Sequence, residues 1–418
     1  MKLNVPSDPV IFENAFLIDG CGGDPIPGAS VAVSDGVIRE VVDGPVVHGS
    51  ARRVNLAGRT LMPGLIDAHV HPGVVSLTME KQKGLTPAVY VHQVARILEN
   101  DLQMGFTTLR DADLLDVGFK AAVNEGYING PRLKLAVTGL IQSGSEGYDP
   151  GFSRKPADAQ NPLGVKPEVC DGPDEVRRAA RRVLGLNADQ IKVFASGEVV
   201  SQSQYDPSTP YHQKFSVPEL RAAVETAQAA STYVMAHAYG PRAISNCIEA
   251  GVACIEHGNL LDDQTAARMA EAGTYFVPTL TVYSVLANES RAAMETRALE
   301  KLDMVRDQGM IALESAYRAG VTIGSGSDII GPFQELKGRE LAIKAEVMGA
   351  MAAIVSATKT NAEILSIQNQ TGTIEPGKSA DLIVVERNPL DDPSIFATEG
   401  RHVALVMLAG RVCKNKLE

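Results

Sequence analysis

The sequence predicts an α/β fold, a (β/α)8 TIM barrel with a small β-sandwich domain built from both chain termini. Two observations lead to this prediction. Short apolar runs alternate with helical stretches between residues 62 and 370, whereas residues 9–60 and 371–418 are short strand-like runs separated by tight turns. Such alternation indicates a parallel sheet with helices outside it, and about eight strands fit a closed barrel better than an open sheet. No GxGxxG motif follows the first strand of this region, which counts against a dinucleotide-binding fold.

The two terminal segments carry hairpin signals and need each other to fold. Asp35-Gly36 and Ala409-Gly410 each lie between two apolar runs, as the turns of β-hairpins do. A small sheet cannot bury an apolar face without a partner. The sequence therefore predicts one β-sandwich domain from residues 1–60 and 371–418, with a barrel domain at residues 61–370 inserted between its halves.

The barrel elements follow one another in a regular order after a first strand that ends near His69. Predicted helices and strands then alternate, each helix being followed by an apolar strand. The predicted helices span residues 86–105, 119–130, 174–189, 217–232, 241–251, 263–273 and 310–320. The strands that follow them span residues 107–113, 132–139, 190–198, 233–240, 252–259, 274–281 and 321–328.

Composition excludes several classes of function. The 418 residues are 44% hydrophobic and 21% charged, as in ordinary globular proteins. A net charge of −11 argues against a nucleic-acid or anionic-membrane partner, since both require basic surface. The first residues have no apolar signal core and no long apolar run occurs, so we expect a cytoplasmic protein. The five cysteines contain no CxxC pair, so neither a disulfide framework nor a thiolate zinc site is predicted.

Chemistry-bearing residues gather at the ends of the predicted barrel strands. His69 and His71 are two residues apart, so on a strand their imidazoles project from one face, as adjacent ligands of a metal ion would. Taken alone, such a pair is more often a packed core histidine and a loop residue than two metal ligands. Barrel active sites, however, lie at the carboxyl ends of the strands. Further candidates at those ends are Lys192, His237, His257 and Asp328.

These residues lie in segments that resemble the amidohydrolase superfamily of metal-dependent hydrolases. The matching motifs extend over nearly the whole chain: PGLIDAHVH, GFTTLRDAD, IKVFASG, MAHAYGPRAI, CIEHGNL, GSD and GTIEPGKSADLIVV. Within the superfamily the sequence is most similar to the prolidase-like carboxypeptidase and dipeptidase branch, which includes ochratoxin-hydrolysing amidohydrolases. The HAYGPRAI, IEHGNL and GSDIIGPFQELKGREL segments point to this branch.

The resemblance implies a binuclear metal site, usually with zinc, and a hydrolytic mechanism. His69, His71 and Asp328 would hold the first metal, and His237 and His257 the second. Lys192 would be N-carboxylated and bridge the two ions, which would explain a lysine within an apolar strand. Two such metals lower the pKa of a bridging water, and Asp328 would pass its proton to the leaving amine. The sequence contains no GxSxG elbow, the motif that would indicate a covalent acyl-enzyme.

Substrate-binding candidates come from positions near this set. Tyr239 lies two residues after His237, and relatives use a tyrosine there to bind substrate; a buried structural tyrosine is the alternative. Glu146 stands where relatives commonly carry the histidine of a Gly-Gly-His-Gly stretch, and an acid there would repel a free carboxylate. His212 lies in a polar loop at residues 201–213 that is a candidate lid or an ordinary surface connection.

Three functions remain open at this point. The first is hydrolysis of an amide bond in a dipeptide, an N-acyl amino acid or an ochratoxin-like amide. The second is hydrolysis of a cyclic amide, phenylurea or carbamate on the same metals. The third is a non-catalytic metal-binding scaffold, which the complete set of ligand candidates disfavours. The expected partners are a small-molecule amide substrate and further copies of the chain in a homo-oligomer. We expect three charged residues at the end of one predicted strand either to support the site or to form structural ion pairs; these are Arg110, Asp111 and Asp113.

Overall fold

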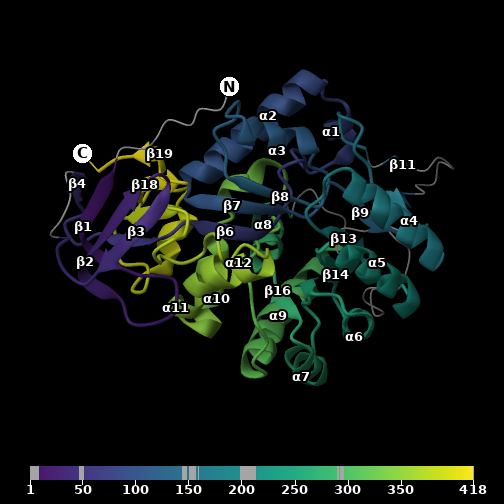
Figure 1. Ribbon diagram of the computed structural model, residues 1–418. Coiled ribbons are helices and arrows are strands. Elements are labelled where there is room, and N and C mark those ends of the chain that lie inside the picture. Colours follow the sequence, from purple (N-terminus) through teal and green to yellow (C-terminus); the bar gives the residue numbers. More distant parts are fainter. Residues whose placement is uncertain are drawn as a thin grey trace.

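A computed structural model describes residues 9–46, 51–143, 148–149, 157–158, 160–197, 213–289, 291 and 296–417. Strands from both ends of the chain lie in one eight-stranded sheet, with the order β19-β18-β17-β5-β1-β2-β3 and with β4 paired to β1. Figure 1 shows these purple and yellow strands side by side. Their bounds are β1 Val10–Leu17, β2 Ile26–Ser34, β3 Val37–Val42, β4 Arg52–Asn55, β5 Thr60–Pro63, β17 Leu382–Val385, β18 Val403–Leu408 and β19 Arg411–Asn415.

The two chain ends meet where β5 pairs with β17 in an antiparallel ladder. Both predicted hairpins are confirmed: β2 pairs with β3 across Asp35-Gly36, and β18 pairs with β19 across Ala409-Gly410. All four turn residues have positive φ, between 49° and 77°, as tight hairpin turns require. The terminal strands share one apolar core. They are assigned as one continuous sheet, so the two-sheet sandwich and the domain division at residues 1–60 and 371–418 stay predictions.

The central strands are all parallel to their neighbours and confirm the predicted α/β alternation. They are assigned in two sheets, one of three strands and one of six. The first contains β6 Leu65–Val70, β7 Phe106–Asp111 and β8 Arg132–Leu135, and the second contains β9 Gly139–Ile141, β12 Glu168–Val169, β13 Ile191–Phe194, β14 Val234–Ala238, β15 Cys254–His257 and β16 Tyr275–Val277. Two short strands, β10 Tyr148–Asp149 and β11 Ala157–Asp158, pair separately.

The predicted last strand, residues 321–328, lies between β16 and β6. Ile323 forms a parallel bridge to Phe276. Farther along, the Asp328 amide donates to the carbonyl of His69 at 2.8 Å. This segment approaches β6 so closely that a Cβ on Gly326 would lie 2.6 Å from the Cβ of His69. This segment thus connects the edge of the six-stranded sheet to the edge of the three-stranded sheet, and a single closed eight-stranded sheet is not assigned among the described residues.

Helices cover the outside of the central strands (Figure 1). Their amphipathic faces pack on the sheet, and several of them begin with a side-chain cap. For example, Ser216 and Glu219 form a capping box at the start of α5. The helices are α1 Met79–Lys83, α2 Pro87–Gln103, α3 Val117–Asn124, α4 Gly172–Gly185, α5 Val217–Ala229, α6 Pro241–Ala250, α7 Asp263–Ala272, α8 Leu280–Glu289, α9 Thr296–Arg318, α10 Arg339–Met348, α11 Ala350–Val355 and α12 Asn361–Ile364. The 3-10 helices are η2 Gly331–Leu336 and η4 Pro393–Ala397, and η3 Ser356–Thr360 is a π-helical segment.

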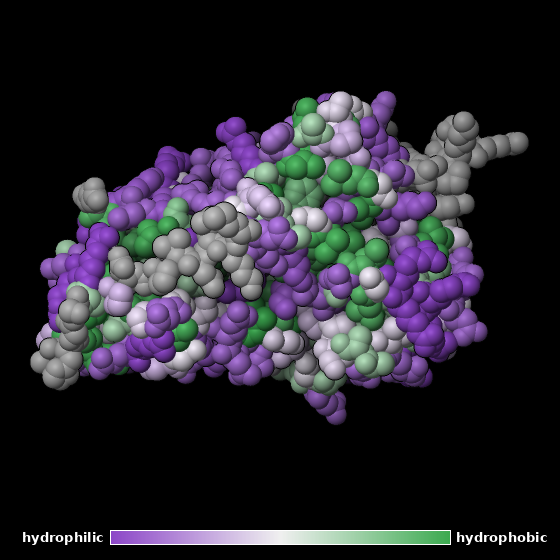
Figure 2. All heavy atoms as spheres, turned by 45° about the horizontal axis from the view of Figure 1, so that its top comes forward, coloured by the Kyte–Doolittle hydropathy of each residue, from purple (hydrophilic) through white to green (hydrophobic). Residues whose placement is uncertain are grey.

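Large hydrophobic side chains also reach the surface. Tyr127 is 76% exposed and Ile311 is 53% exposed. Figure 2 shows that hydrophobic areas lie among hydrophilic ones on one face of the molecule. Among the described residues, no helix combines the length and the apolar character needed to cross a bilayer. The predicted homo-oligomer is not tested by a single chain.

Candidate active site

Three strand ends and the 321–328 segment bring four histidines and an aspartate together. The imidazole centroids of His69 and His71 are 5.3 Å apart, those of His69 and His257 are 4.9 Å apart, and those of His237 and His257 are 4.4 Å apart. Asp328 lies against this row of rings. The convergence follows from the parallel sheet, because the carboxyl ends of its strands meet at one edge.

Asp328 is the carboxylate that the histidines share. Its Oδ1 lies 3.1 Å from Nε2 of His71 and 3.5 Å from Nε2 of His69, and its Oδ2 lies 3.7 Å from Nδ1 of His257. Ligand atoms of His69, His257 and Asp328 all lie within 4.8 Å of one another. The Nε2 atom of His69 is buried and has no hydrogen-bond partner among the described residues. Two imidazoles and a carboxylate with such an unsatisfied nitrogen could hold a divalent metal ion.

Burial keeps most of these histidines neutral, which is the form that binds metals. Desolvation lowers the pKa of His69, His237 and His257 well below the ordinary value, and the positive charge of Lys192 acts in the same direction. His71 differs. Burial lowers its pKa, but the hydrogen bond and charge of Asp328 outweigh that effect and leave the pKa raised.

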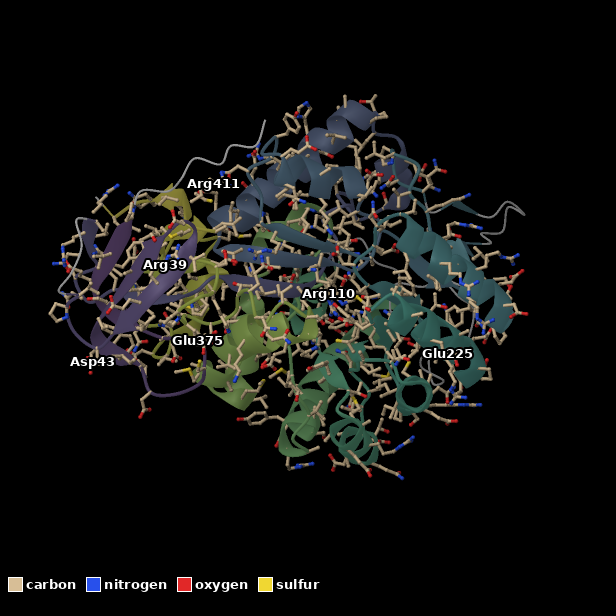
Figure 3. The ribbon with its side chains drawn as sticks, viewed as in Figure 1. Arg39, Asp43, Arg110, Glu225, Glu375 and Arg411 are labelled. Atoms are coloured by element: carbon tan, nitrogen blue, oxygen red, sulfur yellow. The ribbon has the colours of Figure 1, made fainter. Side chains whose placement is uncertain are left out.

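A buried ion pair orients His69. Nδ1 of His69 donates to Oε2 of Glu256 at 2.7 Å, and Nη2 of Arg110 donates to Oε1 of the same carboxylate at 2.8 Å. All three side chains are fully buried. Figure 3 places Arg110 in the middle of the molecule, among the central strands. Because Nδ1 carries the proton toward Glu256, Nε2 presents its lone pair on the side of Asp328. The interpretation of Arg110 as a support or ion pair thus agrees with the structure.

Glu256 was not among the site residues predicted from the sequence, and strand register explains why. The β14–β15 ladder pairs His237 with Glu256 and Ala238 with His257. Paired residues of parallel strands project from the same face, so Glu256 faces inward beside His237. His257 would then point outward, but its φ of +76° turns the chain and brings its ring to the site. The one signal in the sequence is an acid next to a candidate ligand, and alternation along the strand would place that acid on the outer face.

Three residues at the site have an unusual backbone conformation. His257, Thr279 and Asp328 all have positive φ although none is glycine. Such residues cost about 1–3 kcal/mol each and persist where surrounding contacts hold them. Thr279 Oγ1 lies 2.8 Å from Nδ1 of His257. Asp67 accepts hydrogen bonds from the amides of His69 and Ser327, which fixes the chain next to Asp328.

Lys192 and Tyr239 also reach this region. Lys192 is 1% exposed, its Nζ lies 5.0 Å from the ring centroid of Phe194, and burial lowers its pKa. The ring of Tyr239 stacks on that of His257, with centroids 5.3 Å apart and an interplanar angle of 18°. The hydroxyl of Tyr239 is 2.8 Å from that of Tyr283 in α8. Tyr283 was missed because the predicted strand at 274–281 is shorter in the structure, and α8 begins where that strand was expected to continue.

Two of the predicted substrate-binding residues lie outside the described residues. These are Glu146 and His212, together with most of the predicted lid at residues 201–213. Their roles therefore stay predictions.

Known proteins resemble this chain over nearly its whole length. The sequence pattern of the Amidohydrolase family matches residues 60–413. The chain belongs to the amidohydrolase family. It is 30% identical to ochratoxinase of Aspergillus niger, an alignment that covers 96% of this chain and 85% of the relative. This amidohydrolase is also similar to a prolidase solved in complex with N-methylphosphonate-L-proline, with 36% identity, a TM-score of 0.90, and 97% and 100% of the two chains covered.

A solved structure of A. niger ochratoxinase has 28% identity and a TM-score of 0.86, and covers 98% of this chain and 96% of its own. These relatives place the chain in the prolidase-like and ochratoxin-hydrolysing branch that its motifs predicted. The amidohydrolase is therefore an enzyme, a hydrolase that acts on amide bonds.

Proposed function

We propose that this amidohydrolase cleaves the amide bond of a dipeptide, an N-acyl amino acid or an ochratoxin-like amide. The observation that carries the proposal is the cluster of His69, His257 and Asp328 at the carboxyl ends of the central strands, where a metal ion and a proton-transfer group would act together. The relatives named prolidase and ochratoxinase support the substrate class.

The residues of the site fit two divalent metal ions, which we propose to be Zn²⁺. His69, His71 and Asp328 would hold one, and His237 and His257 the other. N-carboxylated Lys192 would supply oxygen ligands to both. The unpartnered Nε2 of His69 and the lowered pKa of its buried imidazole favour this assignment. Bound metal ions would activate the attacking water and polarise the scissile carbonyl.

The side chains of the chain itself would position and transfer the proton. Asp328 is proposed to accept the proton of the attacking water on its carboxylate and to deliver it to the nitrogen of the leaving amine. Its side chain is 17% exposed, whereas that of His69 is fully buried, so a substrate can approach the carboxylate. Tyr239, stacked on His257, is proposed to contact the substrate with its hydroxyl.

Glu256 is expected to control metal affinity through His69. In Glu256→Gln the side chain keeps its shape, but Arg110 loses its buried counter-charge and His69 its anionic acceptor. Loss of such a partner of a metal ligand weakens metal binding by about 10–100-fold. Zinc affinity, measured by competition with a chromophoric chelator, is the readout, and Glu249→Gln on the exposed face of α6 is the control. Equal affinities of both variants would show that the Glu256 contact does not orient a ligand.

A substrate panel on zinc- and bicarbonate-reconstituted protein tests the proposed function, with released amine as the readout. It contains dipeptides, including Xaa-Pro, and N-acyl amino acids with a free α-carboxylate. The same compounds with an amidated terminus serve as matched controls, and ochratoxin and a phenylurea complete the panel. We expect turnover of at least one compound of the amide class.

The outcome also decides the role of Glu146. Preference for free carboxylates would mean that Glu146 does not face that end of the substrate. Cleavage of only the amidated compounds would mean that Glu146 shapes the pocket. Cleavage of the phenylurea alone would replace the proposed substrate class.

The finer architecture is part of the same proposal. We propose that residues 321–328 close the central strands into a (β/α)8 barrel and that the terminal strands form the β-sandwich domain. The enzyme is further proposed to act as a cytoplasmic homo-oligomer on small-molecule substrates, and analytical ultracentrifugation measures the assembly.

A further inference from the structure

Two buried tyrosine hydroxyls face each other beside the row of histidine rings. The hydroxyl of Tyr283, in the first turn of α8, lies 2.8 Å from that of Tyr239, and both residues are 3% exposed. The ring of Tyr283 is inclined at 65° to that of Tyr239 and at 80° to that of His257, with centroids 6.3 and 6.5 Å apart. Tyr283 therefore adjoins both the residue proposed to contact the substrate and a candidate metal ligand.

The hydroxyl pair is embedded in an apolar cluster. Buried side chains of α8 and α9 belong to this cluster, among them Val285, Leu302 and Val305, and so does Ile329, which follows Asp328. A hydrogen bond in such surroundings is stronger than in water, and separating its partners is costly. The two hydroxyls are thus held together more firmly than a solvated pair would be.

The start of α8 is itself held by a neighbouring helix. Glu340 of α10 is 1% exposed, and its carboxylate accepts hydrogen bonds from the amides of Leu280 and Thr281 and from the Thr281 hydroxyl, at 3.2, 2.8 and 2.7 Å. A carboxylate is favourable at this end of a helix because the first amides point toward it. Directly before α8, the hydroxyl of Thr279 contacts Nδ1 of His257. The helix therefore begins at a fixed position relative to the site.

The direction of the hydrogen bond decides what Tyr239 can do. Each phenol has one hydrogen, so one hydroxyl of the pair donates and the other accepts. If Tyr239 donated, its hydrogen would be used on Tyr283. If Tyr283 donates, the hydrogen of Tyr239 is directed at another acceptor, and the bond that Tyr239 receives polarises its O–H group and makes it a stronger donor. Only the second arrangement lets Tyr239 donate to an oxygen of the substrate.

We propose that Tyr283 is a positioning residue that donates to the hydroxyl of Tyr239 and so aims the hydrogen of Tyr239 at an oxygen of the bound substrate. The inference rests on the proposed function, which supplies the contact between Tyr239 and the substrate. Helix α8 thereby contributes to the reaction without supplying a candidate metal ligand. An effect that passes through Tyr239 must disappear once the hydroxyl of Tyr239 is removed.

A double-mutant cycle on kcat/KM tests this dependence. The variants are Tyr283→Phe, Tyr239→Phe and the double variant, which keep both rings and lose only hydroxyl groups; exposed Tyr127→Phe is the control. We expect Tyr283→Phe to lower kcat/KM on the best panel substrate by about 3–10-fold at unchanged zinc content. The double variant should match Tyr239→Phe alone, and Tyr127→Phe should match the wild type.

Several results of the cycle would overturn the proposal. Effects that multiply in the double variant would show that Tyr283 acts independently of Tyr239. Wild-type kcat/KM in Tyr283→Phe, with or without a lower melting temperature, would leave Tyr283 with a structural role alone. Wild-type kcat/KM in Tyr239→Phe would remove the contact through which Tyr283 is proposed to act.

Fluorine NMR of the zinc-loaded full chain labelled with 3-fluorotyrosine gives a readout that needs no turnover. The chain has ten tyrosines, and the resonance missing from Tyr239→Phe identifies that residue. Because Tyr283→Phe keeps the neighbouring ring, we expect loss of the hydroxyl contact to shift the Tyr239 resonance, whereas Tyr127→Phe leaves it in place. An unshifted resonance would overturn the proposal even if the panel shows turnover. If the panel shows none, the proposed function fails, and the spectrum still decides whether the two hydroxyls are coupled.

Discussion

Asp328→Asn is expected to lower kcat by about 10²–10⁴-fold while the protein stays folded. The amide has the shape of the carboxylate but cannot take a proton from the attacking water. It also removes the negative charge that Nε2 of His71 and Nε2 of His69 approach at 3.1 and 3.5 Å. The measurement is kcat on the best substrate of the panel, with zinc content and thermal stability recorded for each sample.

The metal content separates the two roles that we propose for this residue. If Asp328 only held a metal ion, excess zinc would restore turnover along with occupancy. The proton-transfer role instead requires kcat to stay low in fully loaded protein. Asp307→Asn, at an exposed position in α9, is the matched control and should behave as the wild type. Wild-type kcat in loaded Asp328→Asn would remove this residue from proton transfer.

The positions of the candidate ligands could be predicted because they depend on one simple feature. In a parallel sheet the carboxyl ends of all strands meet, so polar residues that end apolar runs converge without knowledge of the loops. His69, His237 and Asp328 come together in this way. The pairing of the terminal strands was predictable for a comparable reason, since neither segment could bury a face alone.

The side chains of the site that could not be predicted from the sequence owe their positions to strand register and to backbone conformation. Glu256 faces inward because β14 and β15 pair His237 with Glu256, and register is set by tertiary packing. His257 reaches the site only through its left-handed backbone, which is uncommon for residues other than glycine and is held by its surroundings. Tyr283 enters from a helix whose start was assigned to a strand. The positions of these three side chains thus depend on features that the alternation of polar and apolar residues along the sequence does not specify.

Lys192→Ala is expected to lose bound metal and activity together, with turnover at least about 10²-fold below the wild type. The physical reason begins with burial, because a lysine that is 1% exposed has a lowered pKa. The neutral amine is the form that reacts with carbon dioxide, so the lowered pKa makes Lys192 available for the carboxylation that we propose. Removing the side chain would remove the oxygen ligands proposed for both metals and would leave Asp328 as the one carboxylate among the proposed ligands.

Metal analysis and released-amine assays on Lys192→Ala, with exposed Lys83→Ala as the control, check this result. A short carboxylic acid such as propionate fits the space that the lysine vacates and should partly restore both metal binding and turnover, whereas a neutral amide of the same size should restore neither. Full metal content and wild-type turnover in Lys192→Ala would contradict the bridging role. A bridging ligand must raise the occupancy of the metal sites before it can restore turnover. Rescue of turnover by propionate without a gain in bound metal would therefore assign the lost carboxylate to catalysis rather than to metal coordination.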